Sequence, residues 1–379
     1  MKKSYLMIAA AAALFVACAG NDVINEIVDE EIAIGFEGKY VNKETRAEIT
    51  QSWFSNADEN HFGVYGYKGD FQLFNNEDVK WDNTNNDWTH STVRFWDKSA
   101  TNYNFYAYAP YDATHTFTDK KFSFTSVPVI IDITQDNADI AISTPITAMS
   151  YGNCTHIDPA VAGHGEGHVE FDFNHILSKL AFKVKTSVNP NSAEIKVTEV
   201  KLDFPQGTAT WSQTAYDAIA GTTTYSGYTS KDAVVNDVID YSKYETTVFE
   251  GSTAALTSSA IDIVDATTAT NKGKVFIVAP VAESGDAAEH VFGLKVTYNV
   301  QYKKEDPDHA GQYINDGDPE VGCIATGIIG GGQSTATQYK PTQNSSYVIT
   351  IDVNPAQIQF CVDQVISWEN DTPREVEVK

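Results

Sequence analysis

Apolar and polar residues alternate strictly along several stretches of this chain. Between Phe292 and Tyr302 every second residue is apolar, and small or polar residues stand between them. The same period of two recurs in Leu180–Val184, Tyr347–Val353 and Tyr103–Ala109. Such alternation predicts antiparallel strands with one buried and one solvated face, packed in sandwiches. No stretch keeps a helical period beyond one or two turns, so the pattern predicts an all-β protein.

The alternation also predicts local details. The stretch Ile195–Phe204 changes phase near Thr198 and Glu199, and one extra residue there would restore a single apolar face. We therefore expect a β-bulge at that point. This strand follows Leu180–Val184 across the turn at Asn189–Ser192, which predicts that the two strands pair as a hairpin.

The loss of alternation marks the expected connections. The stretch Tyr151–His168 is rich in Gly, Pro, His and Asp and predicts a linker. The chain is long enough for two domains, which we place at residues 47–165 and 166–379. Weak periodicity predicts long surface connections at Ser212–Thr270, and the Gly-rich stretch Ala310–Gln343 predicts a further loop region.

The first residues predict export. Lys2 and Lys3 precede an apolar run that ends at Ala17, and Cys18 follows directly. A basic start and a short apolar run are typical of a signal peptide, here residues 1–17, and the run is shorter than the roughly 20 residues of a membrane-spanning helix. A small residue before Cys predicts acylation of Cys18, and hence an outer-membrane anchor made of acyl chains alone. The alternative is an ordinary signal peptide with an incidental cysteine.

Charge narrows the choice of partners. The formal net charge is −25, so the surface repels phosphate backbones and nucleic acid is not expected as a partner. Besides Cys18, the cysteines are Cys154, Cys323 and Cys361, without the spacing of a zinc site. One disulfide with a spare thiol and three unpaired cysteines both remain open.

No stretch indicates catalysis, a metal site or a cofactor. His164 and His168 lie four residues apart, but glycines flank them and no helical pattern surrounds them, so a metal site is not expected. The Gly-rich stretch after Gly327 lacks the lysine of a phosphate loop, and Gly-x-Ser-x-Gly does not occur. The oxygen-rich stretch Asp82–Asp87 predicts a hairpin turn between two tryptophans rather than a calcium loop. The chain is not expected to be an enzyme.

Several segments, taken in order, resemble fimbrillin-like proteins, the type V pilins. They are the cysteine after the signal peptide, Ile32–Phe36, Thr45–Ala47, Phe62–Gly66, Asn104–Pro110, Phe173–Leu180 and Val365–Trp368. The resemblance covers nearly the whole chain after the signal peptide. It implies two transthyretin-like β-sandwiches in series, and in it His175 is expected to be a packed strand residue rather than a ligand.

The resemblance also implies a mode of assembly. An arginine-specific protease would cut between Arg46 and Ala47 and remove residues 18–46 as a tether and propeptide strand. The displaced strand would present Ile32, Ile34 and Phe36. An incoming subunit would fill the exposed groove with a C-terminal donor strand, for which the alternating residues are Ile358, Phe360, Val362, Val376 and Val378.

These expectations define the functional alternatives. The first is a structural subunit of a pilus, located at the outer membrane and cell surface and extracellular after processing. Its partners would be other pilin subunits, the protease and, through adhesion, a host or glycan ligand. The alternative is an anchor or tip subunit, or a stand-alone glycan-binding lipoprotein of the same fold.

Overall fold

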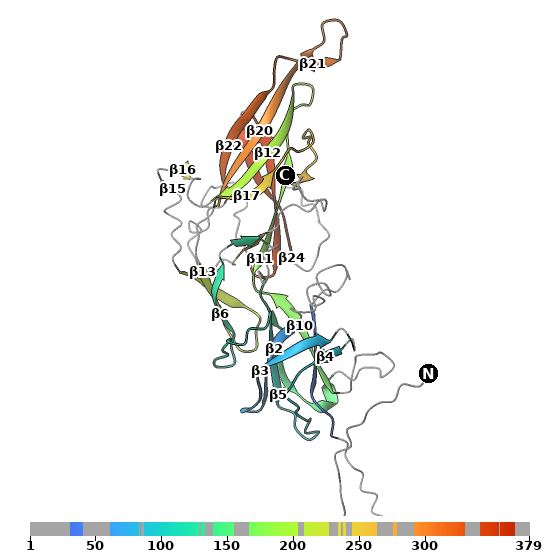
Figure 1. The fold of residues 1–379 in the computed structure, drawn as a ribbon, viewed down its shortest axis with the longest axis vertical. Helices are drawn as coiled ribbons and strands as arrows, with labels where there is room; N and C mark the ends of the chain where they lie inside the picture. Colours follow the sequence, from blue (N-terminus) through green and yellow to red (C-terminus); the bar gives the residue numbers. More distant parts are fainter. Residues whose placement is uncertain are drawn as a thin grey trace, which may run out of the picture.

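The structure is all-β. The computed structural model describes residues 31–40, 61–82, 84, 87–128, 130–132, 139–154, 167–203, 208–226, 234–235, 238–239, 245–263, 276–278, 292–329, 342–355 and 357–367. Apart from one 3-10 turn, η1 (Tyr151–Asn153), the regular elements in these residues are strands, which confirms the predicted fold class. The molecule is elongated, with its early strands at one end and its late strands at the other (Figure 1). In the described part of the chain no helix has the length and apolar character needed to cross a bilayer.

One large sheet forms the end of the molecule that carries the early strands. Its order is β1-β10-β8-β5-β2-β3-β4, and β9 also pairs with β5. Its strands are β1 (Gly35–Tyr40), β2 (His61–Lys68), β3 (Phe71–Asp82), β4 (Asp87–Thr89), β5 (Tyr103–Ala109), β8 (Ala141–Ser143), β9 (Ile146–Met149) and β10 (His168–His175). The pairing of β1 with β10 is parallel, and the other pairings in this sheet are antiparallel. The predicted turn after Asp82 is confirmed, because Trp81 pairs with Trp88 across it.

A second, smaller sheet covers the outer face of the first one. It has the order β14-β13-β6 and consists of β6 (Ser123–Pro128), β13 (Thr208–Gln213) and β14 (Gly221–Ser226). Between the two sheets lies an aromatic core that includes Tyr106, Tyr108 and Trp211. As a result β5 is buried on both faces, and the prediction of one solvated face is wrong for this strand.

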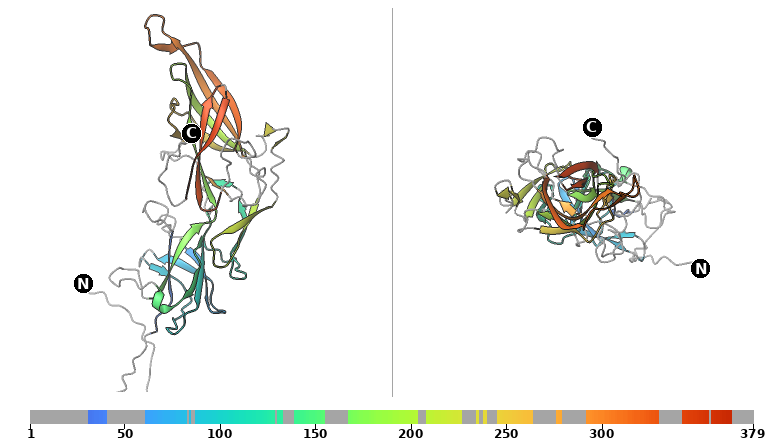
Figure 2. Two further views of the ribbon diagram at one scale, coloured as in Figure 1. Left: turned by 180° about the vertical axis from the view of Figure 1, so that it is seen from behind. Right: turned by 90° about the horizontal axis from the view of Figure 1, so that it is seen from above.

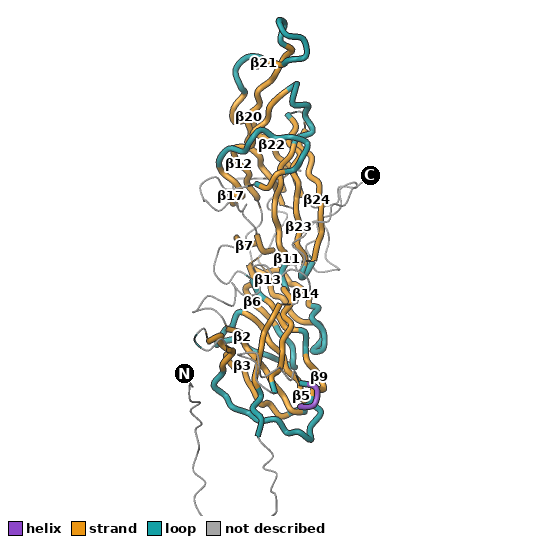
Figure 3. The backbone as a smooth tube through the Cα atoms, turned by 90° about the vertical axis from the view of Figure 1, so that its right-hand side faces the viewer, coloured by secondary structure: helices purple, strands orange, loops and turns teal. Residues whose placement is uncertain are grey.

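The other end of the molecule contains two facing sheets (Figures 2 and 3). The first has the order β24-β23-β11-β19-β7 with β18 beside β11, and the second the order β17-β12-β20-β21 with β22 beside β20. The strands of the first are β7 (Ile130–Asp132), β11 (Ser178–Lys185), β18 (Ile261–Asp262), β19 (Phe276–Val278), β23 (Ser345–Asn354) and β24 (Gln357–Ser367). Those of the second are β12 (Ala193–Asp203), β17 (Glu245–Glu250), β20 (Phe292–Glu305), β21 (Tyr313–Asn315) and β22 (Glu320–Ile329). A short pair, β15 (Val234–Val235) and β16 (Val238–Ile239), stands apart.

The core between these two sheets explains the strict alternation. The apolar residues of β11, β12, β20 and β23 meet there in one cluster. The predicted bulge is confirmed, since the register with β20 shifts between Val197 and Glu199. The predicted hairpin is wrong, because β11 pairs with β23 and β12 pairs with β20. The turn after Asn189 therefore joins two sheets, whose apolar faces pack on each other, rather than two paired strands.

The sheets do not divide the chain at the predicted boundary between residues 165 and 166. Strand β10 lies after that boundary but pairs with β1 and β8 of the first sheet. Strand β7 lies before it but pairs with β19 at the other end of the molecule. The stretch Ser212–Thr270, expected to form surface connections, contributes strand β14 and the buried residues Val248 and Phe249. Likewise, β21 and β22 occupy much of the predicted loop at Ala310–Gln343.

Candidate functional site

The segment that begins the described chain fills the core of the first sheet. Ile34 and Phe36 are each 1% exposed, and Ile32 packs against the same cluster. The ring of Phe36 lies 4.9 Å from the ring of Phe74 in an edge-on arrangement. The strand residues expected to be displaced are thus brought together in one core, as alternation predicts for a strand with one buried face.

On one side, β1 is held by a single neighbouring strand. The register pairs Gly35 with His168 and continues to Tyr40 opposite Phe173. A parallel pairing is slightly less stable per residue than an antiparallel one. On the other side, the residues just before β1 meet irregular chain: the Ile34 amide donates to the Arg94 carbonyl at 2.8 Å.

A hydrogen bond between two side chains adds to this hold. Glu37 is 7% exposed, and its Oε1 lies 2.7 Å from Nδ1 of His168. The two residues belong to β1 and β10, so the contact joins the two strands through their side chains. Burial of a carboxylate lowers stability unless the carboxylate has a partner. Loss of either Glu37 or His168 would therefore weaken the binding of β1 to β10.

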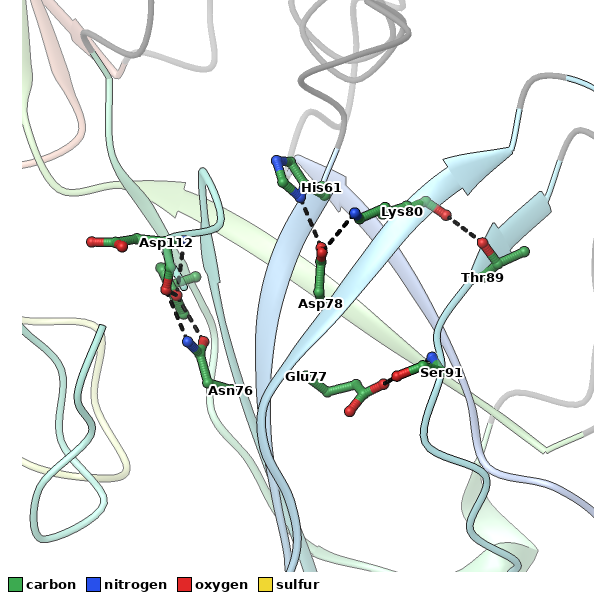
Figure 4. A network of polar contacts seen from close by, with 9 residues as sticks. His61, Asn76, Glu77, Asp78, Lys80, Thr89, Ser91 and Asp112 are labelled. Atoms are coloured by element: carbon green, nitrogen blue, oxygen red, sulfur yellow. Dashed lines mark hydrogen bonds and ion pairs between the residues drawn. The ribbon is translucent and has the colours of Figure 1, made fainter. Parts of the chain in front are cut away.

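The irregular wall beside β1 is fixed by one carboxylate of β3. Glu77 accepts hydrogen bonds from the amide and hydroxyl of Ser91 at 2.9 and 3.0 Å, and from the amide and hydroxyl of Thr92 at 2.8 and 2.5 Å. Figure 4 shows Glu77 reaching Ser91 across this wall. Burial opposes ionisation of Glu77, but the hydrogen bonds from Thr92 and Ser91 outweigh burial and hold its pKa below the ordinary value.

His90 and Trp96 connect the wall to the first segment and to the residue before β10. Nε2 of His90 lies 3.2 Å from the Ile34 carbonyl. Burial lowers the pKa of His90, against the opposing charge of Glu77, so the neutral imidazole is favoured. The buried indole of Trp96 donates to the Gly167 carbonyl at 2.7 Å, and the Trp96 amide donates to the Ile32 carbonyl at 2.9 Å. The wall and β10 therefore enclose the segment from both sides.

Without β1, the space that this strand fills would be an apolar groove. Its lining is aromatic and aliphatic, formed by Phe62, Phe74, Phe105, Val169 and Phe171. The edge of β10 would lose its only partner on that side. Unpaired backbone groups beside an apolar trough bind an added strand, since the strand supplies hydrogen bonds and alternate side chains. Burial of Ile34 and Phe36 alone is worth about 3–6 kcal/mol to whichever strand provides such residues.

The C-terminal candidates are divided between described and undescribed residues. Strand β24 pairs antiparallel with β23 and is the last strand in its sheet. The register places Ile358, Phe360 and Val362 opposite Val353, Ile351 and Ile349. These predicted donor residues therefore belong to a sheet at the other end of the same molecule. They are not in the sheet that contains β1. Cys18, Arg46, Ala47, Val376 and Val378 lie outside the described residues.

The other polar residues considered from sequence form no metal centre in the described part of the chain. His168 pairs with Glu37, as above. His175 is 5% exposed in β10 and contacts Asp139, so it is a packed strand residue, as expected. His164 lies outside the described residues.

Sequence reasoning missed the residues that hold β1 in place. Glu77 and Ser91 are 14 residues apart, Trp96 and Gly167 are 71 apart, and Glu37 and His168 are 131 apart. Alternation reports which face of a strand is buried, but not which distant segment covers that face. No signal in a single sequence would have revealed these pairs.

The chain belongs to the fimbrillin-like family, whose model matches residues 45–316. It is 23% identical to the fimbrium subunit Fim1C of Phocaeicola vulgatus over 408 aligned residues, which cover 100% of this chain and 99% of that protein. A solved structure of a fimbrial protein from Bacteroides vulgatus aligns with a TM-score of 0.48 and 18% identity. That alignment covers 89% of this chain and 99% of the other.

Proposed function

We propose that this protein is a structural subunit of a cell-surface fimbrium that supports adhesion. The subunit is exported as a lipoprotein acylated at Cys18, cut between Arg46 and Ala47, and polymerised by donor-strand exchange. Membership of the fimbrillin-like family and similarity to a fimbrium subunit along the whole chain support the fimbrial role. The outer membrane holds the subunit before cleavage, and the fimbrium holds it afterwards.

One observation supports the exchange step above all others. Phe36 fills the core of the first sheet from β1, whose one paired strand is β10, and Ile34 fills it from the residue just before β1. Arg46 follows the end of this strand by six residues, close enough for one cut to separate β1 from the rest of the chain. After the cut only non-covalent contacts retain β1, and a donor strand with matching apolar residues can replace it.

The donor comes from the C-terminal region of another subunit. Two segments carry the necessary alternation, one containing Ile358, Phe360 and Val362 and the other containing Val376 and Val378. In the structure the first segment belongs to β24, which is paired with β23. Donation of β24 would thus require loss of ten register pairs, whereas donation of the last twelve residues would leave the second core intact.

The cut is tested by substitution of Arg46. In cells that assemble the fimbrium, Arg46→Lys should abolish heat-resistant multimer ladders, because an arginine-specific protease does not cleave after Lys. Wild-type protein sheared from the same cells should begin at Ala47. Arg94→Lys is the matched control and should leave ladders unchanged. Ladders that persist in Arg46→Lys would contradict the proposed maturation.

A second role, that of anchor or tip subunit or of a stand-alone glycan-binding lipoprotein, makes a different prediction in the same experiment. An anchor subunit would keep acylated Cys18 and the first strand, and sheared material would contain no Ala47 terminus, whereas a tip subunit would have no use for a donor tail. Mass spectrometry of the N-terminal peptide therefore separates the two roles directly.

A further inference from the structure

A cavity of about 350 Å³ lies on the outer side of the first sheet, away from the core that β1 fills. It is bounded by the end of β5, the loop that follows β5, and β6. Its floor is formed by Tyr108, His115 and Phe124. Because strand exchange involves the inner face of the sheet, the proposed assembly does not use this cavity.

The aromatic floor is fixed by contacts within the protein. The imidazole of His115 stacks on Tyr108 with ring centroids 4.2 Å apart, and its centroid is 5.0 Å from that of Phe124. The hydroxyl of Tyr65 donates to the His115 carbonyl at 2.9 Å. Nε2 of His115 is buried and makes no standard hydrogen bond within the described residues. The floor thus consists of three aromatic rings, tilted against one another, whose positions are set before any ligand arrives.

The loop at the mouth of the cavity is also held in one conformation. Tyr108 donates through its hydroxyl to the Asn76 side-chain oxygen at 2.8 Å, and the Asn76 amide donates to the Asp112 carbonyl at 2.8 Å. Figure 4 shows Asn76 and Asp112 in contact. Asn76 has a left-handed backbone with φ of 53°, a conformation that persists only where surrounding contacts enforce it. A preorganised rim reduces the entropy that a ligand must overcome on binding.

A bulge shapes the third wall. In the pairing of β6 with β13, the register shifts between Ala209 and Trp211, so that Thr125 and Ser126 together oppose one residue. Ser126 has φ of 61°, also in the left-handed region. Bulges redirect side chains near binding sites. Here the exposed Thr125 lines the cavity beside Phe124.

The rim of the cavity is polar, and hydroxyl groups predominate in it. Hydroxyl groups surround the mouth, contributed by Thr114, Thr116, Ser123 and Thr125. Asp112 supplies a carboxylate, and among the described residues that line the cavity none is Lys or Arg. Hydroxyls that donate and accept, over an apolar aromatic floor, suit a ligand with many hydroxyls and one apolar face. A carboxylate without a neighbouring cation disfavours an anionic ligand.

We propose that this cavity binds a neutral saccharide, with space for one or two sugar rings. This inference rests on the proposed function in one respect: the saccharide would be the ligand through which the fimbrium adheres. Sugar C–H groups would pack on the floor, and sugar hydroxyls would bond to the threonine and serine rim. Acidic sugars such as N-acetylneuraminic acid are disfavoured by Asp112.

Saturation-transfer NMR on the full chain tests the proposal. The probes are methyl β-D-galactoside, methyl α-D-mannoside, N-acetylglucosamine and N-acetylneuraminic acid. At least one neutral sugar should receive saturation and should bind more tightly than N-acetylneuraminic acid. Thr125→Glu and, separately, Thr116→Glu should weaken that binding about tenfold. Thr224→Glu, on the exposed face of neighbouring β14, is the matched control and should bind as the wild type does.

Three results would overturn the proposal. The first is no saturation transfer to any neutral sugar at about 20 mM, a concentration far above the range of useful affinity. The others are unchanged sugar binding in both rim variants and tighter binding of the acidic sugar than of the neutral ones. Thermal melting of each variant verifies that it is folded. Multimer ladders are scored in parallel, because normal ladders without sugar binding would refute the cavity proposal alone, whereas sugar binding without ladders would refute the assembly alone.

Discussion

Gly35 lies directly opposite His168 in the parallel pair of β1 and β10, and a Cβ atom at Gly35 would stand 2.1 Å from Cδ2 of His168. The His168 ring cannot simply turn aside, because Nδ1 is engaged by the buried Glu37 at 2.7 Å. The absence of a side chain at residue 35 thus lets β10 approach closely enough to pair with β1. β1 is held here by a close fit to β10, its one paired strand.

Gly35→Ala should therefore weaken the hold on β1. Overpacking of this kind costs about 1–3 kcal/mol in unfolding free energy. The measurement is denaturant unfolding of the uncleaved chain without its signal peptide. Gly152→Ala is the control, because its Cβ would meet only Ser150 Oγ at 3.9 Å. The double variant Gly35→Ala/His168→Ala should recover part of the loss in a double-mutant cycle, and a strictly additive result would show that the steric explanation is wrong.

Phe36→Ala should destabilise the uncleaved chain by about 3–5 kcal/mol, the cost of removing a buried aromatic ring from a packed core. Phe95→Ala is the matched control, since Phe95 is 48% exposed and its loss should change stability by about 0.5 kcal/mol or less. Equal effects of the two substitutions, measured by denaturant unfolding, would mean that β1 does not occupy the core as described.

Alternation along the chain predicts the local features of a strand but not the strand's partners. It predicted the buried faces of β11, β20 and β23 and located the bulge at Thr198, because a strand face and a phase change are local properties. It assigned β12 to the wrong partner, because a run such as Leu180–Val184 specifies a buried face and not which sheet supplies the neighbour.

The candidate site was predicted only in part for a related reason. Tyr106 and Tyr108 are large and apolar on the face expected to be wet, which in hindsight signals a second covering layer. This layer is supplied by β6, which begins at Ser123, and by β13, which begins 100 residues after Tyr108 at Thr208. The wall made by Glu77 and Ser91 likewise depends on contacts between segments that share no pattern.

Acid should reduce stability partly through His115. Burial lowers the pKa of His115 below its ordinary value of 6.5, against the opposing charge of Asp112. Below pH 6.5 the His115 imidazole of the unfolded chain binds a proton that the folded chain does not bind. The contribution of neutral His115 to the free energy of unfolding is therefore complete above pH 6.5 and is lost as the pH falls through and below that value. His115→Phe should flatten the dependence of unfolding free energy on pH between about 7 and 5.

The control for this effect is His309→Phe, a substitution of a largely exposed ring, which should keep the wild-type slope. Denaturant unfolding at a series of pH values gives the three slopes. A wild-type slope in His115→Phe would show that protonation of this imidazole is not coupled to unfolding.

Deletion of residues 368–379 should abolish heat-resistant multimers while leaving the monomer as stable as the intact chain. The reason is that β24 ends at Ser367 and keeps its ten register pairs with β23, so the second core is not disturbed. Val376 and Val378 are lost in this deletion, whereas Ile358, Phe360 and Val362 remain. Gel ladders and thermal melting of the same preparation provide the two readings. Undiminished ladders would exclude the last twelve residues as the donor, and ladders that also survived Phe360→Asp would leave no C-terminal segment to act in strand exchange.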